Sequence, residues 1–181
     1  MAILDDIDIQ LRNLLNTRAI FPYMTHDLIG HSIFNTAPFY QARGYNIQFQ
    51  FGEPLNQSRL DELNSICHWI NQNYLIRLCS LLEYNEIIPR EDQGRLDNSR
   101  EGFDDIDILR RIRNIFSHTS GRYNSSDPDE IRLYNRIIEQ YHLDRSTIIN
   151  ANEYPIPIDK VIIPITEGCK KYIQSIVTMI V

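Results

Sequence analysis

Residues 58–82 read SRLDELNSICHWINQNYLIRLCSLL, the most regular amphipathic stretch of the chain. Its apolar residues recur at steps of three and four, the spacing of one helix face: Leu60, Leu63, Cys67, Ile70, Tyr74, Leu78 and Leu81. Leu75 and Leu82 widen this stripe into a surface that a domain core would cover. Ser58 is followed three residues later by Asp61, a weaker form of the capping box, so we expect the helix to open at Ser58.

Other segments of the chain also carry helical signals. They are residues 3–19, about 103–120, about 128–141, and a last segment that begins near Asp159 or Pro164. Gly121 is expected to end the second of these helices, and Asp127-Pro128 supplies an N-cap and a first-turn proline for the third. Helices with short connections predict an all-α helical bundle, in a single domain spanning residues 1–181.

Residues 20–57 have a different character, because aromatic residues are crowded there between prolines and glycines. Within this segment, residues 45–51 (YNIQFQF) alternate strictly between apolar and polar, which predicts a β-strand. Phe39–Gln41 is one option for its partner. We therefore expect a small aromatic-rich insertion with β structure near residues 20–57, whose rings either stack bases or form a hydrophobic cluster of their own.

The amino-acid composition argues against some classes of function. The 181 residues include 18 Lys and Arg against 24 Asp and Glu, a net charge of −6. This acidic balance argues against a protein that coats nucleic acid through bulk positive charge, but it permits a small local phosphate site. No glycine-rich phosphate loop is present among the seven glycines.

The cysteines, the N-terminal residues and the lengths of the apolar runs predict the cellular location of the protein. Cys67, Cys79 and Cys169 show no metal-ligand spacing, so we expect buried free thiols in a reducing compartment, with no metal and no cofactor. The N-terminal residues are acidic where a signal peptide would be basic. No apolar run approaches the roughly 20 residues of a membrane span. These features predict a soluble cytoplasmic protein without membrane contact.

The helix expected over residues 103–120 carries the chemistry. On a helical wheel its core face comprises Ile108, Leu109, Ile112, Ile115 and Phe116. A polar stripe follows on the other side, made of Asp107, Arg110, Asn114 and His118, with Arg111 at its border. Arg113 lies at the opposite edge of the polar face, about 140° from His118. The simplest interpretation is a solvated face with ordinary surface ion pairs.

The string Arg113-Asn114-Ile-Phe-Ser-His118 has the form Arg-Asn-x-x-x-His. It resembles the motif of HEPN domains (higher eukaryotes and prokaryotes nucleotide-binding), over about residues 58–181. The resemblance implies a four- or five-helix bundle that pairs as a homodimer, with the two motif helices lining a shared cleft. It also implies a metal-independent endoribonuclease acting on RNA in a toxin–antitoxin or phage-defence setting, with an antitoxin or defence protein as partner.

The resemblance also assigns roles. His118 would be the general acid and base for attack of a ribose 2′-hydroxyl on the adjacent phosphodiester, leaving a 2′,3′-cyclic phosphate. Arg113 would bind the phosphate, and Asn114 would orient His118 or the phosphate. Imidazole titrates near neutral pH, and a guanidinium matches phosphate geometry, so the residue types suit this chemistry. Further phosphate contacts are expected from the neighbouring arginines Arg110, Arg111 and Arg122.

Two features separate this chain from parts of that family. A subgroup of HEPN toxins carries a tyrosine two residues after the histidine, the target of an adenylating partner, whereas this chain has Ser120 there and its nearest tyrosine is Tyr123. Other HEPN domains keep the fold without nuclease activity. A non-catalytic RNA-binding or protein-interaction module is therefore the alternative function, and a purely structural bundle with a solvated polar stripe is a third.

Overall fold

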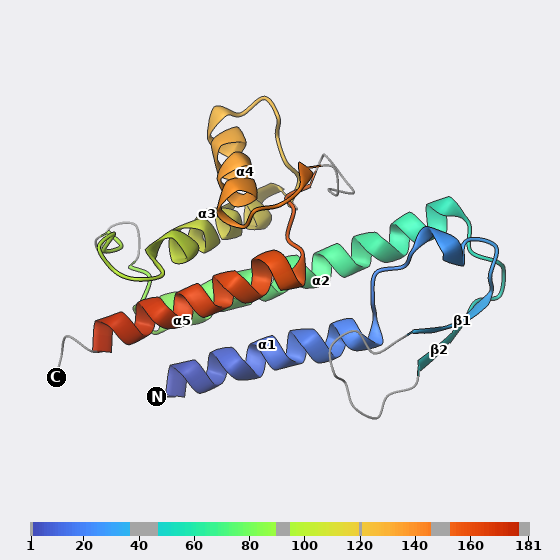
Figure 1. The fold of residues 1–181 in the computed structure, drawn as a ribbon, viewed down its shortest axis with the longest axis horizontal. Coiled ribbons are helices and arrows are strands. Elements are labelled where there is room, and N and C mark those ends of the chain that lie inside the picture. The colour runs from blue at the N-terminus through green and yellow to red at the C-terminus, as the bar shows by residue number, and fades with distance from the viewer. Residues whose placement is uncertain (1, 37–46, 90–94, 120, 146–152, 178–181) are drawn as a thin grey trace. The chain divides into compact units, whose positions relative to one another are not determined.

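The computed structural model describes residues 2–36, 47–89, 95–119, 121–145 and 153–177, without the side chains of residues 36, 47 and 119. These residues form five α-helices and one small sheet (Figure 1), which confirms the predicted all-α fold with a small β insertion. The elements are α1 (Ala2–Ile20), η1 (His26–Leu28), β1 (Ile33–Thr36), β2 (Ile47–Gln50), α2 (Gln57–Tyr84), α3 (Phe103–Thr119), α4 (Pro128–Gln140), η3 (Ile158–Ile162) and α5 (Ile163–Val177).

The chain divides into two compact units, one made of residues 1–7 and 72–181 and the other of residues 8–71. Helices α1 and α2 each contribute residues to both units. The candidate site residues all belong to the first unit. The expectation of a single domain over residues 1–181 stays a prediction.

The unit of residues 8–71 contains the aromatic insertion. Strand β2 pairs antiparallel with β1, and Phe49 lies opposite Phe34. The predicted strand is thus present, but its partner in the described chain is β1, while the suggested partner Phe39–Gln41 lies outside the described residues. The rings of Phe34 and Phe49 stack at 5.5 Å between centroids. They belong to a hydrophobic cluster with Met24, Leu55 and Leu60, so Phe34 and Phe49 lie in a small core within this unit.

Helix α2 begins slightly earlier than the sequence indicated. The side chain of Asn56 accepts a hydrogen bond from the backbone N–H of Arg59 at 3.0 Å, so Asn56 is the N-cap. The expected capping box of Ser58 and Asp61 was wrong, and the Asp61 carboxylate instead accepts a hydrogen bond from the Gln57 side chain at 2.7 Å. Asn and Ser are equally good N-caps, and the earlier residue forms the cap here.

In the other unit, helix α3 buries one face. The side chains of Ile108, Leu109 and Ile112 are fully buried, and Phe116 is nearly so, as the spacing predicts. Ile115, expected in the core, is only half-buried, and Ile106 is fully buried instead. On the wheel Ile106 shares the edge of α3 that carries Arg113, and Arg113 contacts α2, so this edge is covered as well.

Helices α3 and α5 meet almost backbone to backbone. A Cβ atom added to Gly102, just before α3, would lie 2.0 Å from the backbone oxygen of Gly168 in α5. A Cβ on Gly168 would lie 2.0 Å from the carboxylate of Asp105. Gly102 also has φ +82°, a conformation that favours glycine. The absence of a side chain at Gly102 permits this approach, which places the N-terminal end of α3 on α5.

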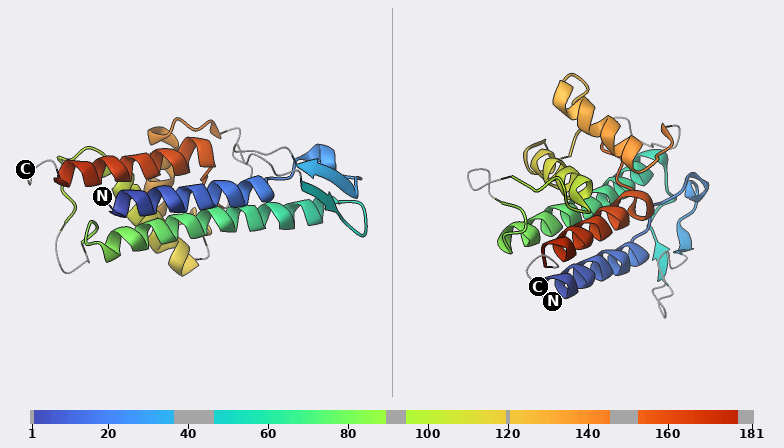
Figure 2. Two further views of the ribbon diagram at one scale, coloured as in Figure 1. Left: turned by 90° about the horizontal axis from the view of Figure 1, so that it is seen from below. Right: turned by 60° about the vertical axis from the view of Figure 1, so that its left-hand side comes forward.

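The remaining helices complete this unit. Figures 1 and 2 show α5 running along α2, where the hydroxyls of Tyr74 and Thr166 hydrogen-bond at 2.8 Å, and they show α4 inclined to α5. The Asp127 carboxylate accepts a hydrogen bond from the N–H of Asp129 at 2.8 Å, which confirms the predicted N-cap of α4. Helical backbone begins at Ile158, beside the predicted start at Asp159, with the π-helical segment η3, and α5 follows directly from Ile163 with Pro164 in its first turn.

Cys67, Cys79 and Cys169 are free and buried, as expected. Within the described ranges, no helix combines the length and the apolar character needed to span a membrane.

The close contact between α3 and α5 makes Gly102 sensitive to substitution. We expect Gly102→Ala to lower the free energy of unfolding by about 1–3 kcal/mol, because the added methyl group collides with backbone at a positive φ. Urea unfolding followed by circular dichroism measures this loss. The control is Gly52→Ala, since a Cβ there meets nothing within 4 Å. A Gly102→Ala protein as stable as wild type would contradict the close contact.

Candidate functional site

Helix α3 carries Arg113, Asn114 and His118 within its last turns. It ends at Thr119, and Gly121 follows with φ +78° in a buried position, which confirms the predicted stop. A Cβ on Gly121 would lie 2.0 Å from the side-chain amide of Gln72 in α2, so the chain leaves α3 pressed against α2.

Arg113 is held by two acceptors. Its Nη2 atom forms an ion pair with Oε2 of Glu83 at 3.1 Å, and its Nη1 atom donates to Oδ1 of Asn114 at 3.1 Å. Glu83 belongs to the last turn of α2, and both charged side chains are 31% exposed. The sequence analysis did not identify Glu83, because it lies 30 residues from Arg113 and no local pattern links them.

A buried thiol lies behind Glu83. The Sγ atom of Cys79, one helical turn earlier, is 3.9 Å from Oε1 of Glu83 and donates to it. Burial, together with the Glu83 carboxylate, raises the pKa of Cys79 to about 12, so the thiol keeps its proton at neutral pH. The positive charges of Arg113 and of Arg110, a partly buried residue of α3, oppose that rise in pKa.

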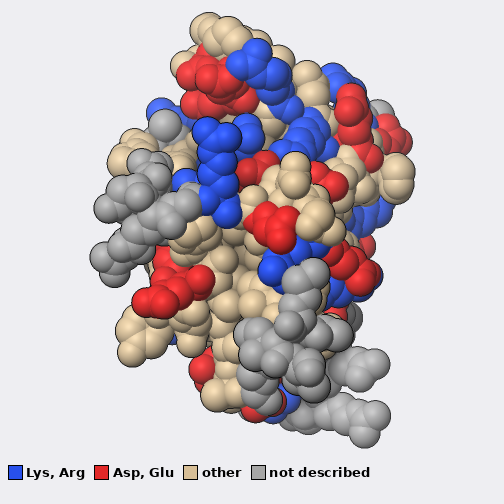
Figure 3. Space-filling view, turned by 90° about the vertical axis from the view of Figure 1, so that its left-hand side faces the viewer, with Lys and Arg blue, Asp and Glu red and all other residues tan. Residues whose placement is uncertain are grey.

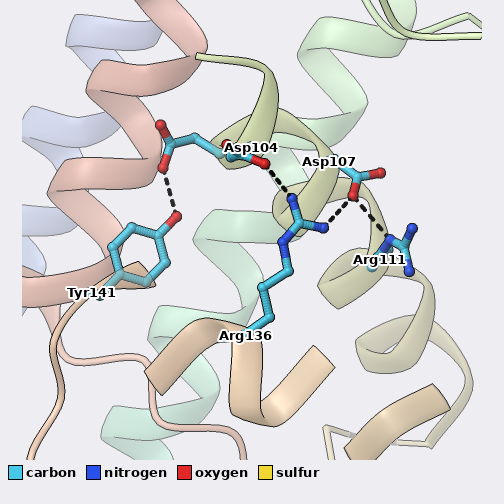
Figure 4. A network of polar contacts seen from close by, with 6 residues as sticks. Asp104, Asp107, Arg111, Arg136 and Tyr141 are labelled. Atoms are coloured by element: carbon cyan, nitrogen blue, oxygen red, sulfur yellow. Dashed lines mark hydrogen bonds and ion pairs between the residues drawn. The ribbon is translucent and has the colours of Figure 1, made fainter. Parts of the chain in front are cut away.

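The opposite edge of α3 carries a second charge network (Figure 4). Oδ2 of Asp107 accepts hydrogen bonds from Nε of Arg111 at 3.1 Å and from Nη1 of Arg136 in α4 at 2.5 Å. Arg136 also pairs with Asp104 at 2.7 Å. The two carboxylates raise the pKa of the Arg136 guanidinium against the effect of its desolvation, so the network stays charged. Arg111, expected to contact RNA, is thus already paired with a carboxylate.

Asp105 lies at the end of this network nearest to α5. Its Oδ1 atom accepts a hydrogen bond from the hydroxyl of Tyr141 at 2.7 Å. Partial burial raises the pKa of the Asp105 carboxyl, and this hydrogen bond acts in the opposite direction. Burial and the nearby Asp105 also raise the pKa of Tyr141, so the phenol is the donor.

His118 differs from the arginines around it. Its side chain is exposed, and among the described residues its imidazole makes no hydrogen bond or ion pair. Arg122 is exposed just beyond Gly121, where its backbone forms an isolated bridge with Glu153. The structure therefore brings Arg113 and Asn114 together, directs Arg111 to Asp107, and leaves His118 apart from these contacts.

The surface agrees with these local pairings. On the described surface drawn in Figure 3, basic and acidic side chains lie beside one another over the visible face.

No family model, no curated protein and no solved structure matches this chain. Within the described part of the chain, no group of three or more His, Cys, Asp or Glu side chains is placed to hold a metal ion. The groups suited to proton transfer and to phosphate binding are the imidazole of His118 and the guanidinium of Arg113.

The environment of Asp105 predicts a pH effect on stability. Because its pKa is raised in the folded protein, Asp105 contributes stability at acid pH that is lost as the pH rises from about 3.8 through the folded-state pKa. Asp105→Asn takes up no proton there. We therefore expect the stability of Asp105→Asn relative to wild type to increase from acid to neutral pH, as measured by urea unfolding at a series of pH values.

Tyr141→Phe is the companion variant for this measurement. Removing the hydroxyl takes away a hydrogen bond that lowers the pKa of Asp105, so the loss of stability with rising pH should become larger than in wild type. If the difference between Asp105→Asn and wild type does not change with pH, the raised pKa is wrong.

Proposed function

We propose that this protein is a metal-independent endoribonuclease of HEPN type. It cleaves RNA by attack of a ribose 2′-hydroxyl on the adjacent phosphodiester and leaves a 2′,3′-cyclic phosphate. The observation that carries the proposal is the string Arg113-Asn114-x-x-x-His118 on one continuous helix. Its histidine is exposed to solvent, and its arginine is held in a defined orientation by two acceptors.

Each residue has a role that its surroundings allow. His118, without a partner among the described residues, is open to take a proton from the 2′-hydroxyl and to return one to the leaving oxygen. Arg113 binds the phosphate and stabilises the charge that grows on it in the transition state. Asn114 accepts from Arg113 and so contributes to its orientation. Arg110 and Arg122 supply further phosphate contacts, and Arg111 does so while paired with Asp107.

The separation of the two reactive groups supports a homodimer. A regular helix places Arg113 and His118 about 140° apart, and Arg113 turns toward α2 to reach Glu83. A second subunit related by a two-fold axis supplies the missing group across a shared cleft. In this proposal the dimer acts in a toxin–antitoxin or phage-defence system of the cytoplasm, with an antitoxin or defence protein as its partner.

The ion pair between Arg113 and Glu83 also favours a second candidate, a non-catalytic RNA-binding or protein-interaction module. In that case the carboxylate that neutralises Arg113 is its permanent partner, and the motif stabilises the contact of α3 with α2. The two candidates differ in what His118 does, because only the nuclease needs its imidazole.

The nuclease proposal is tested with purified protein and single-stranded RNA or tRNA in EDTA. We expect wild type to produce 2′,3′-cyclic phosphate ends, and His118→Ala to cleave at least about 100-fold more slowly because proton transfer is lost. Arg113→Ala should be similarly impaired. The matched control is Arg132→Ala, since Arg132 is an exposed arginine of α4 that pairs with Asp129 outside the motif; it should cleave like wild type.

Equal cleavage by wild type and His118→Ala would remove His118 from the mechanism. If wild type cleaves nothing yet retards RNA in a gel, the non-catalytic module is the function. Size-exclusion chromatography with light scattering provides the second readout, because a stable monomer would lack the shared cleft.

A further inference from the structure

We propose that Glu83 is a positioning residue for the phosphate-binding arginine of this site: its carboxylate and the Asn114 side chain hold the Arg113 guanidinium in the orientation that receives RNA. This inference rests on the proposed nuclease function and deepens it. Glu83 lies on a different helix from the motif and is not part of it.

Each of the two terminal nitrogens of the Arg113 guanidinium donates to its own acceptor. Nη2 contacts Glu83 of α2 at 3.1 Å, and Nη1 contacts Asn114 of α3 at 3.1 Å. Two acceptors on two helices fix both the plane of the guanidinium and its rotation within that plane. A single acceptor would leave that rotation free.

Glu83 is itself anchored. Its Oε1 atom faces the fully buried thiol of Cys79 at 3.9 Å, while Oε2 faces Arg113 at 3.1 Å. The thiol is a weak donor, but it lies on the same helix one turn earlier, so it constrains which way the carboxylate points. The contacts thus run from a buried residue of α2, through Glu83, to the guanidinium on α3.

Arg113 can still bind a phosphate in this arrangement. A guanidinium has more N–H donors than the two used here, and the side chain is 31% exposed. Arginine loses much rotamer freedom when it binds a phosphate, and prior fixing by Glu83 and Asn114 reduces that loss. Because the carboxylate repels RNA phosphates, its benefit should appear in the rate of cleavage and not in the affinity for RNA.

Two conservative substitutions of Glu83 separate the effect of its side-chain length from the effect of its negative charge. Glu83→Asp keeps the charge but withdraws the carboxylate by one methylene, whereas Glu83→Gln loses the charge but keeps an oxygen at the same reach. Positioning predicts that Glu83→Asp lowers kcat about 10- to 100-fold, the scale expected for a displaced catalytic group. Glu83→Gln should stay within about threefold of the wild-type kcat and should bind non-cleavable 2′-O-methyl RNA at least as tightly as wild type.

Two further comparisons test whether the effect of Glu83 requires Arg113 and whether it is a general effect of removing one negative charge. In an Arg113→Lys background, where the fork is absent, Glu83→Asp and Glu83→Gln should have equal kcat values. Glu139→Gln, at an exposed position on α4, removes the same charge elsewhere. Urea unfolding of every variant shows whether a change in rate accompanies a change in stability.

The outcomes distinguish this proposal from the nuclease proposal. If wild type cleaves RNA and Glu83→Asp cleaves equally fast, Glu83 positions nothing, although the nuclease function stands. If Glu83→Gln cleaves faster than wild type, Glu83 is an inhibitor of the site, and positioning is overturned. A Glu83→Gln protein slower than Glu83→Asp also overturns it, since charge and not reach would then matter. Wild type that cleaves nothing overturns both proposals.

Discussion

The contact between α3 and α5 at Gly102 and Gly168 is the constraint on which the rest of the candidate site depends. A side chain at Gly102 would collide with backbone, and one at Gly168 would collide with Asp105. This approach seats the N-terminal end of α3, and burial of Ile108 and Ile112 along the helix holds the remainder. Once α3 is placed in this way, only two edges and its C-terminal turn are left for polar side chains, and each edge meets a different helix.

The two edges balance most of the positive charge of α3. On one edge, Arg113 forms an ion pair with Glu83 of α2. On the other edge, Asp107 forms ion pairs with Arg111 and with Arg136 of α4. The arginines that gather around His118 in the sequence are therefore not a free basic patch. This explains how a chain of net charge −6 can carry a cluster of arginines without the character of an RNA-coating protein. A phosphate that contacts Arg111 or Arg113 would have to share that arginine with the carboxylate already paired to it.

Local signals predicted the fold well, and contacts between distant residues were missed. The start of α4 at Asp127, the stop of α3 before Gly121 and most of the buried face of α3 depend on residues close together in the sequence. Local patterns were therefore sufficient to predict them. The start of α2 was placed at Ser58 because Asn56 is an equally good cap, and nothing local decides between two such residues. Glu83 and Arg136 could not be found in this way, because they lie 30 and 29 residues from their partners on α3. Their pairing is decided by how α3 packs against α2 and α4, which no spacing within one helix reveals.

Helix geometry also decides what a nuclease would require of this chain. Arg113 and His118 point about 140° apart, and Arg113 is bound on the α2 edge. If Arg113 had to turn toward the His118 of its own chain, it would leave its contacts with Glu83 and Asn114. An ion pair exposed to this degree contributes only about 0–1 kcal/mol, so breaking it is inexpensive, but the guanidinium would then lose its defined orientation. A second copy avoids that conflict, because it can present its His118 to an Arg113 that stays in place. The proposed nuclease would thus require association of two chains, whereas an RNA-binding module would not, so the oligomeric state distinguishes the two proposals.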